Sequence, residues 1–126
     1  MDISATQKRD EGAALVEFAV VATLLFMLLF GIIEFGRAYS MQVQLTNAVR
    51  EGARAAALGK TSAQVQSTVS GSVSGVTGLQ TAVSVCAAAG GGNATVTSTA
   101  LWSYSIPVFG TGSRTLTATG VMRCGG

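Results

Sequence analysis

The side chains that could carry out chemistry are few, and they are unevenly placed along the chain. The 126-residue sequence has no histidine, and after Gly52 its only charged residues are Arg54, Lys60, Arg114 and Arg123. Every carboxylate lies in the first 51 residues: Asp2, Asp10, Glu11, Glu17, Glu34 and Glu51. Active sites generally need several titratable groups gathered in one pocket. The sequence therefore predicts that the chain is not an enzyme and that it binds no metal and no cofactor.

The two cysteines, Cys86 and Cys124, are the remaining reactive groups. With no His, Asp or Glu near them, they cannot complete a four-ligand zinc site. A disulfide is therefore favoured over two free core thiols, and it indicates an oxidising compartment. On the chain-entropy account, closing a loop of this size stabilises a domain by about 4 kcal/mol.

A long apolar run, AALVEFAVVATLLFMLLFGIIEFG, occupies residues 13–36 and contains only Glu17 and Glu34 as charged residues. As a helix, about 24 residues rise about 36 Å, enough to cross a hydrocarbon core of about 30 Å. A buried core helix in a chain of this size would not be apolar on every face for so long. We therefore expect a transmembrane helix. A cleaved secretory signal is less favoured, because the run exceeds the usual apolar segment of about 7–15 residues.

The helical pattern continues beyond the membrane, over residues 37–59. One face recurs at spacings of three and four residues: Phe35, Ala38, Gln42, Leu45, Val49, Gly52 and Ala56, with Tyr39, Ala48 and Ala53 alongside. Leu58-Gly59-Lys60 is a helix stop. Within this face Ala48, Gly52 and Ala56 form a row of small residues that lets another helix approach closely. The row could instead face the protein's own domain, and the two uses are compatible.

Residues 60–126 are predicted to form a small domain. A Thr-Ser capping signal with Val65 and Val69 four residues apart predicts a short amphipathic helix. Three later stretches alternate apolar and polar residues as strands do: Leu79–Cys86, Ala94–Val108 and Ser113–Cys124. The expected fold class is α+β, with one long N-terminal transmembrane and extended helix, a short second helix and an antiparallel sheet of about three strands.

Alternation also predicts which side chains of the strands face inward. Pro107 should end the second strand or place it at an edge, and Gly110-Thr111-Gly112 is expected to form the turn that follows. The inward side chains expected in the second strand are Val96, Ala100, Trp102, Tyr104 and Ile106. Those expected in the third are Leu116, Ala118, Met122 and Cys124.

The first 18 residues contain a leader and a motif at the start of the apolar run. Residues 1–12 are polar, include Lys8 and Arg9, and are expected to be a leader without regular structure. The chain then reads Gly12-Ala13-Ala14-Leu15-Val16-Glu17-Phe18. A basic leader, a glycine and a hydrophobic helix with Glu at its fifth residue and an aromatic next resemble the processing site of type IV pilins and pseudopilins.

The longer run, through EFGRAY to AVREGARAAALG, is similar to the TadE-like family of the Tad (Flp-type) pilus systems. The resemblance is close over residues 9–60 and loose towards the C-terminus. Many family members have a proline partway along the membrane helix, where this chain has Val21-Ala22-Thr23. We therefore expect no proline kink.

The resemblance implies that a prepilin peptidase cuts after Gly12 and frees the Ala13 amine. Glu17 would then pair with that amine on a neighbouring subunit and set the helix register, because a carboxylate within lipid needs a partner. Alternatively, Glu17 is solvated at the headgroup boundary. Glu34 is expected at the far interface, near Arg37 at i,i+3.

The resemblance favours a minor pilin or pseudopilin of a Tad pilus. Its partners would be the prepilin peptidase, other pilins, the Tad assembly platform proteins and the lipid bilayer, in a homo- or hetero-oligomeric helical assembly. A net charge of +2 does not favour nucleic acid. The alternatives are a major subunit of a type IV-like filament and a membrane-anchored exported adhesion or binding domain.

The expected location is the bacterial inner membrane, the extracellular filament, or both. Basic residues flank both ends of the span, so charge alone does not orient it. The cysteine pair and the cleavage motif favour a single-pass protein with a cytoplasmic N-terminus and an exported domain at residues 60–126.

Overall fold

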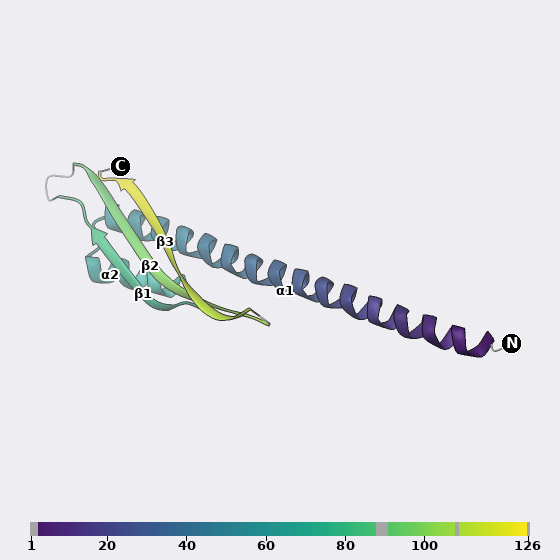
Figure 1. Cartoon of the computed structure of the whole chain (residues 1–126). Helices are drawn as coiled ribbons and strands as arrows, with labels where there is room; N and C mark the ends of the chain where they lie inside the picture. Colours follow the sequence, from purple (N-terminus) through teal and green to yellow (C-terminus); the bar gives the residue numbers. More distant parts are fainter. Residues whose placement is uncertain (1–2, 88–90, 108, 126) are drawn as a thin grey trace.

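The computed structural model describes residues 3–87, 91–107 and 109–125, and it gives side chains from Glu11 onward. Two helices are followed by three strands, which confirms the α+β class. A long helix extends away from a small domain that is built around its C-terminal end (Figure 1). The elements are α1 (Ile3–Ala57), α2 (Ser62–Gly71), β1 (Thr77–Ser84), β2 (Asn93–Ile106) and β3 (Gly110–Arg123).

Helix α1 is one uninterrupted helix of 55 residues, about 80 Å long. The absence of a break confirms the expectation drawn from the missing proline. The expectation that the leader has no regular structure is wrong, because the helix already begins at Ile3. No proline separates Ile3 from Gly12, and Gln7, Lys8, Arg9 and Glu11 are good helix formers, so the helix extends into the polar segment.

The predicted stop of α1 is confirmed at Gly59, which adopts a φ of 83°. Its N–H donates to the carbonyl of Ala56, and the N–H of Lys60 donates to the carbonyl of Ala55, both at 3.1 Å. This pair of hydrogen bonds is the Schellman ending, for which glycine is favoured because a side chain is strained at positive φ. The chain can therefore reverse and return along α1.

Helix α2 begins immediately after this reversal. The Thr61 hydroxyl accepts a hydrogen bond from the backbone N–H of Gln64, and the Gln64 side chain accepts one from the backbone N–H of Thr61. This reciprocal capping box pairs two N–H groups that would otherwise lack partners at the helix start. Val65 and Val69 are buried, as predicted for the amphipathic helix.

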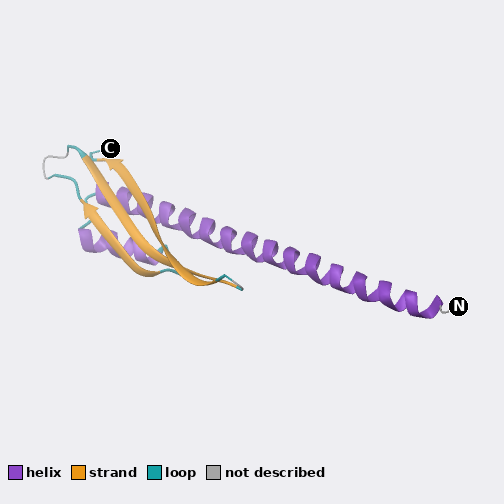
Figure 2. Cartoon of the chain, in the orientation of Figure 1, coloured by secondary structure: helices purple, strands orange, loops and turns teal. Residues whose placement is uncertain are grey.

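The sheet is an antiparallel meander in the order β1-β2-β3. Strand β1 pairs only with the first part of β2, as far as Leu101, whereas β2 and β3 pair along their full length from Asn93 opposite Arg123 to Ile106 opposite Gly110. The last part of the β2–β3 hairpin therefore extends beyond β1, alongside α1 (Figure 2).

The turn predicted at Gly110-Thr111-Gly112 is wrong. These residues belong to β3, opposite Ile106, Ser105 and Tyr104, and the chain reverses between Ile106 and Gly110. Pro107 ends β2 as predicted, because it has no N–H to continue the ladder. Val108, predicted as the last residue of that strand, lies outside the described residues.

Both helices cover the same face of the sheet, and the core lies between the helices and that face. The alternation predicted for β2 is confirmed by buried Val96, Ala100 and Trp102. Met122 of β3 was predicted to face inward but is 39% exposed, because it lies at the rim of the sheet beside Leu58. The core residues contributed by the helices are Leu45, Ala48, Val49, Ala53, Ala56, Val65 and Val69.

The predicted face of α1 is wrong at its first residue, Phe35, which is 75% exposed, and Tyr39 alongside the face is 65% exposed. Ala38 and Gln42 of the same face are half-buried. At this level only the narrow β2–β3 hairpin lies beside the helix, so a smaller part of the helix circumference is covered.

Candidate assembly interface

The N-terminal part of α1 has no cover from the rest of the chain. Between Glu11 and Ile33 its side chains are exposed, apart from partial burial at Ala22 and Met27. Phe18, Leu24 and Ile32 are among its most exposed large apolar residues, at 72%, 61% and 61%. Among the described residues, α1 is the one helix long and apolar enough to cross a membrane. Apolar surface of this extent indicates contact with lipid or with other proteins.

The residues of the predicted processing and assembly site lie on this uncovered segment. Ala13 and Glu17 are four residues apart and therefore share a face of the helix. The space around Gly12 is open, since a Cβ added there would meet nothing within 4 Å. Close packing therefore does not explain this glycine.

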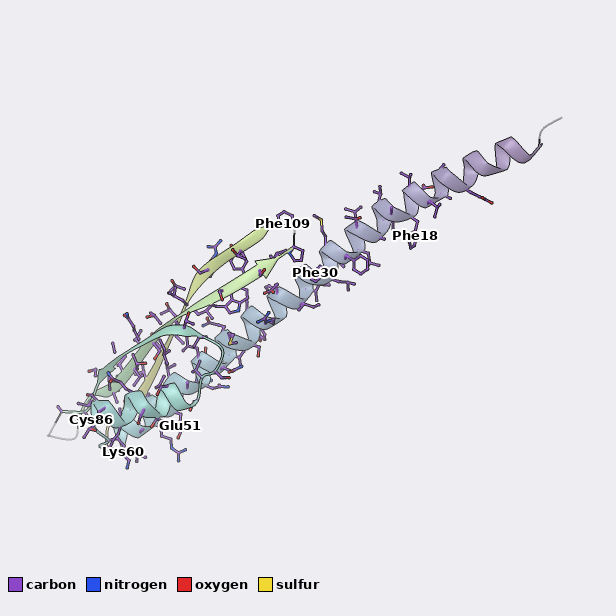
Figure 3. The ribbon with its side chains drawn as sticks, turned by 90° about the horizontal axis from the view of Figure 1, so that it is seen from below. Phe18, Phe30, Glu51, Lys60, Cys86 and Phe109 are labelled. Atoms are coloured by element: carbon purple, nitrogen blue, oxygen red, sulfur yellow. A yellow bond between two sulfur atoms is a disulfide. The ribbon has the colours of Figure 1, made fainter. Side chains whose placement is uncertain are left out.

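Glu17 has no ion-pair partner within the part of the chain that the structure describes. The single ion pair there joins Glu34 to Arg37, as the sequence predicted. Glu17 is exposed among apolar neighbours, with Phe18 directly after it. Figure 3 shows Phe18 projecting from the bare helix, far from the domain. Among the described side chains, none lies close enough to neutralise the Glu17 carboxylate.

The row of small residues packs inside the chain. Ala48, Gly52 and Ala56 are buried beneath α2 and the sheet. A Cβ added to Gly52 would lie 2.7 Å from Cγ2 of Val69 and 3.5 Å from Cγ1 of Val96. The close helix approach that the sequence indicated is therefore made by α2 of the same chain.

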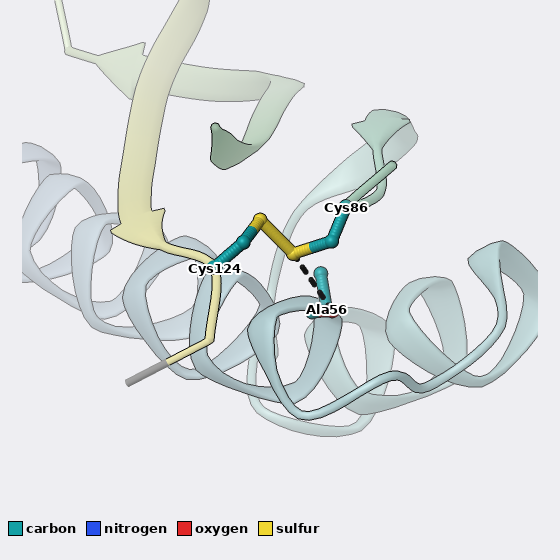
Figure 4. The surroundings of a disulfide bond; sticks show 3 residues. All are labelled: Ala56, Cys86 and Cys124. Atoms are coloured by element: carbon teal, nitrogen blue, oxygen red, sulfur yellow. Dashed lines mark hydrogen bonds between the residues drawn. A yellow bond between two sulfur atoms is a disulfide. The ribbon is translucent and has the colours of Figure 1, made fainter. Parts of the chain in front are cut away.

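The predicted disulfide between Cys86 and Cys124 is present, with the two Cα atoms 5.8 Å apart (Figure 4). It joins the segment after β1 to the segment after β3, so both edge strands are tied together next to the end of α1. The Cys86 sulfur also lies 3.8 Å from the carbonyl oxygen of Ala56. This is a van der Waals contact, because a disulfide sulfur has no proton to donate.

A cavity of about 370 Å³ lies where α1 leaves the domain. We call it the juxtamembrane cavity; Gly31 and Glu34 of α1 and Trp102, Tyr104, Ile106 and Arg114 of the hairpin line it. Oε1 of Glu34 lies 3.4 Å from Nη1 of Arg37. The rings of Trp102 and Tyr104 stand 5.6 Å apart between centroids.

The juxtamembrane cavity brings together two polar atoms that lack partners. Within the described part of the chain, neither Oε2 of Glu34 nor Nε1 of Trp102 has a hydrogen-bond partner, and both atoms are buried. A buried polar group without a partner costs about 1–3 kcal/mol. No sequence pattern indicated that Glu34 and Trp102 line one cavity, because they are 68 positions apart and neither belongs to a spaced motif.

Among the residues that the structure describes, no three His, Cys, Asp or Glu side chains come together to form a group that could hold a metal ion.

Comparison with known protein families shows a resemblance along α1. Residues 12–54 match the model of a family described as TadE-like protein. The match covers α1 from the predicted cleavage site to just before the helix end, and it leaves out α2 and the sheet. No curated protein and no solved structure matches the chain.

Proposed function

Since residues 12–54 of this chain are TadE-like, we propose that it is a minor pilin or pseudopilin of a Tad-type pilus. The TadE-like family is structural, and membership indicates a pilus-associated protein. In the proposed role, the chain waits in the inner membrane as a single-span subunit. It then packs its N-terminal helix among other pilin helices to prime, cap or decorate the filament.

The observation that carries this proposal is the division of α1 into a covered and an uncovered part. The domain buries the face of α1 from Leu45 to Ala56 completely, whereas the apolar side chains before Ile33 have no cover. In a membrane, lipid would surround this segment. In a filament, the same surface is available to other helices, with no rearrangement of the domain.

The proposed processing step supplies the partner that Glu17 lacks. A prepilin peptidase would hydrolyse the peptide bond between Gly12 and Ala13 and leave a free α-amine on Ala13. A charged side chain costs about 2.5–3.5 kcal/mol at the centre of a membrane helix on insertion scales, and less near its end, where Glu17 lies. Pairing with the amine of a neighbouring subunit offsets that cost and fixes the axial register of the two helices.

The folded domain supports a minor role. Major Flp-type pilins are short and nearly all helix, whereas this chain adds α2 and a three-stranded sheet to the helix. We propose that this domain is exported, because its disulfide requires an oxidising compartment. The N-terminus would then remain cytoplasmic, where Lys8 and Arg9 fit the positive-inside rule.

The proposal is tested with Glu17→Ala in cells that carry the full Tad machinery. We expect the variant to be inserted and processed but to be lost from purified filaments, because its helix no longer has a charge that sets its register. Glu51→Ala is the matched control, since Glu51 is an exposed acid on the same helix, beside the folded domain. Immunoblots of membrane and filament fractions measure both variants.

Normal incorporation of Glu17→Ala would contradict the assembly role proposed for Glu17. Absence of the wild-type chain itself from purified filaments would instead favour a membrane-anchored exported domain, which needs the helix only as an anchor.

A further inference from the structure

The β2–β3 hairpin ends in an apolar tip, which we define as Ile106, Pro107 and Phe109. The Phe109 side chain is 73% exposed and Pro107 is exposed, whereas Ile106 is half-buried. Pro107 and Gly110 are ordinary turn residues, but the exposed Phe109 ring adds to the uncovered apolar surface of α1. A continuous apolar surface of this kind indicates that something other than water covers it.

The hairpin tip lies level with the membrane-spanning part of α1. Ile106 and Gly31 line the same juxtamembrane cavity, and Figure 3 shows Phe109 beside the part of α1 that carries Phe30. Gly31 precedes Gly36, the last residue of the predicted span, by five residues, or about 7.5 Å of helix. The apolar face of an interfacial helix is typically buried about 5–10 Å into the boundary between headgroups and acyl chains, which is a comparable depth.

The side chains around the hairpin tip are those expected at a lipid interface. Half-buried Tyr104 stands behind it, with buried Trp102 beneath, and tyrosine is enriched where the hydrocarbon meets the headgroups. Arg37 and Arg114 are exposed nearby, at the level where phosphates would lie. Glu34, the acid in this region, is held by Arg37, and no acidic residue occurs after Gly52. Basic groups close to a membrane surface are attracted to anionic lipid.

We propose that the hairpin tip dips into the leaflet from which the domain emerges, with Phe109 and Ile106 among the acyl chains and Arg37 and Arg114 at the phosphates. The inference rests on the proposed function, because it requires α1 to span a membrane. It goes further by giving the domain a second membrane contact, which holds the sheet against the bilayer before assembly. Withdrawal of the tip from lipid would then accompany the move into a filament.

Photo-crosslinking of the full-length chain tests the contact. The photoreactive amino acid p-benzoylphenylalanine replaces Phe109. The substitution is conservative, because the position is exposed and an aromatic side chain is kept. The purified protein is reconstituted at high dilution in vesicles of phosphatidylethanolamine and phosphatidylglycerol, irradiated, and analysed by mass spectrometry. The same probe at Phe26 of α1 is the positive control. At Val121, which is 56% exposed at the other end of β3, the probe is the negative control.

We expect phospholipid adducts at position 109 in a yield similar to that at position 26, and only background at position 121. Lipid adducts at 26 with none at 109 would place the tip in water, and protein adducts at 109 would place it against another chain. Either result overturns this inference while leaving the membrane anchor intact. If no lipid adducts form at position 26, α1 does not span the bilayer. The proposed function would then fail together with this inference.

Discussion

At the scale of single residues, three glycines of α1 and β3 differ in what surrounds them. Gly12 and Gly36 stand in open space on the helix, whereas a Cβ added to Gly120 would lie 2.7 Å from the carbonyl carbon of Val49 and 2.9 Å from the nitrogen of Arg50. Gly120 therefore allows β3 to pass close against the backbone of α1. Close packing does not require glycine at position 12. This is consistent with the proposal that a peptidase recognises Gly12.

We predict that Gly120→Ala destabilises the domain by about 1–3 kcal/mol, because overpacking against backbone atoms cannot be relieved by rotating a side chain. The measurement is denaturant unfolding of the full chain in detergent, followed by the fluorescence of Trp102, the single tryptophan. Gly36→Ala is the control, and it should leave the free energy of unfolding unchanged or slightly raised. Equal stability of the two variants would mean that β3 does not pass so close to α1.

At the scale of elements, α1 has two segments that need different surroundings. Its C-terminal segment packs on α2 and the sheet, where Leu45 and Val49 are fully buried. Its N-terminal segment exposes apolar side chains around its whole circumference. One continuous helix therefore belongs partly to a folded domain and partly to a membrane or a filament.

This division predicts opposite outcomes for two leucines of the same helix. Leu45→Ala should lower the free energy of unfolding of the domain by about 2–5 kcal/mol, because it removes buried methyl groups and leaves a cavity. Leu25→Ala, at a position 54% exposed, should leave unfolding of the domain in detergent unchanged. A similar loss of stability in both variants would show that the N-terminal segment also packs within the chain.

The elements also show how far the sequence could be interpreted. The helix stop at Gly59, the capping box at Thr61, the alternation along β2 and the cysteine pair were predictable, because each depends on neighbouring residues or on residue type. The extent of β3 was not, since Gly110 and Gly112 normally indicate a turn. Gly112 instead lies opposite Tyr104 in the ladder, where a Cβ would overlap the phenol ring and force that ring to move.

The meeting of Glu34 with Trp102 and Arg114 could not be predicted either. It depends on how far the β2–β3 hairpin extends along α1, which is set by tertiary packing and not by any local pattern. The processing and assembly residues, Gly12, Ala13, Glu17 and Phe18, are a different case. Their placement on the uncovered helix agrees with the prediction, but their roles remain proposals, because they concern other molecules.

At the scale of the whole molecule, the chain is a small stapled domain built around one end of a long helix. The Cys86–Cys124 disulfide closes a separation of 38 residues and stabilises the small core by about 4 kcal/mol on the chain-entropy account. The core of the domain uses α1 from Leu45 onward. The proposed exchange of lipid for neighbouring helices would therefore leave that core unchanged.

The proposed function requires that the chain is cut after Gly12 and enters a filament through the helix that begins at Ala13. Mass spectrometry of the mature N-terminus distinguishes cut from uncut chains, in material recovered with filaments from cells that have the full Tad machinery. We expect a chain that begins at Ala13 and no peptide that contains residues 1–12. Filament-associated chains that keep Met1, or chains that begin at Tyr39 after the apolar run, would contradict it.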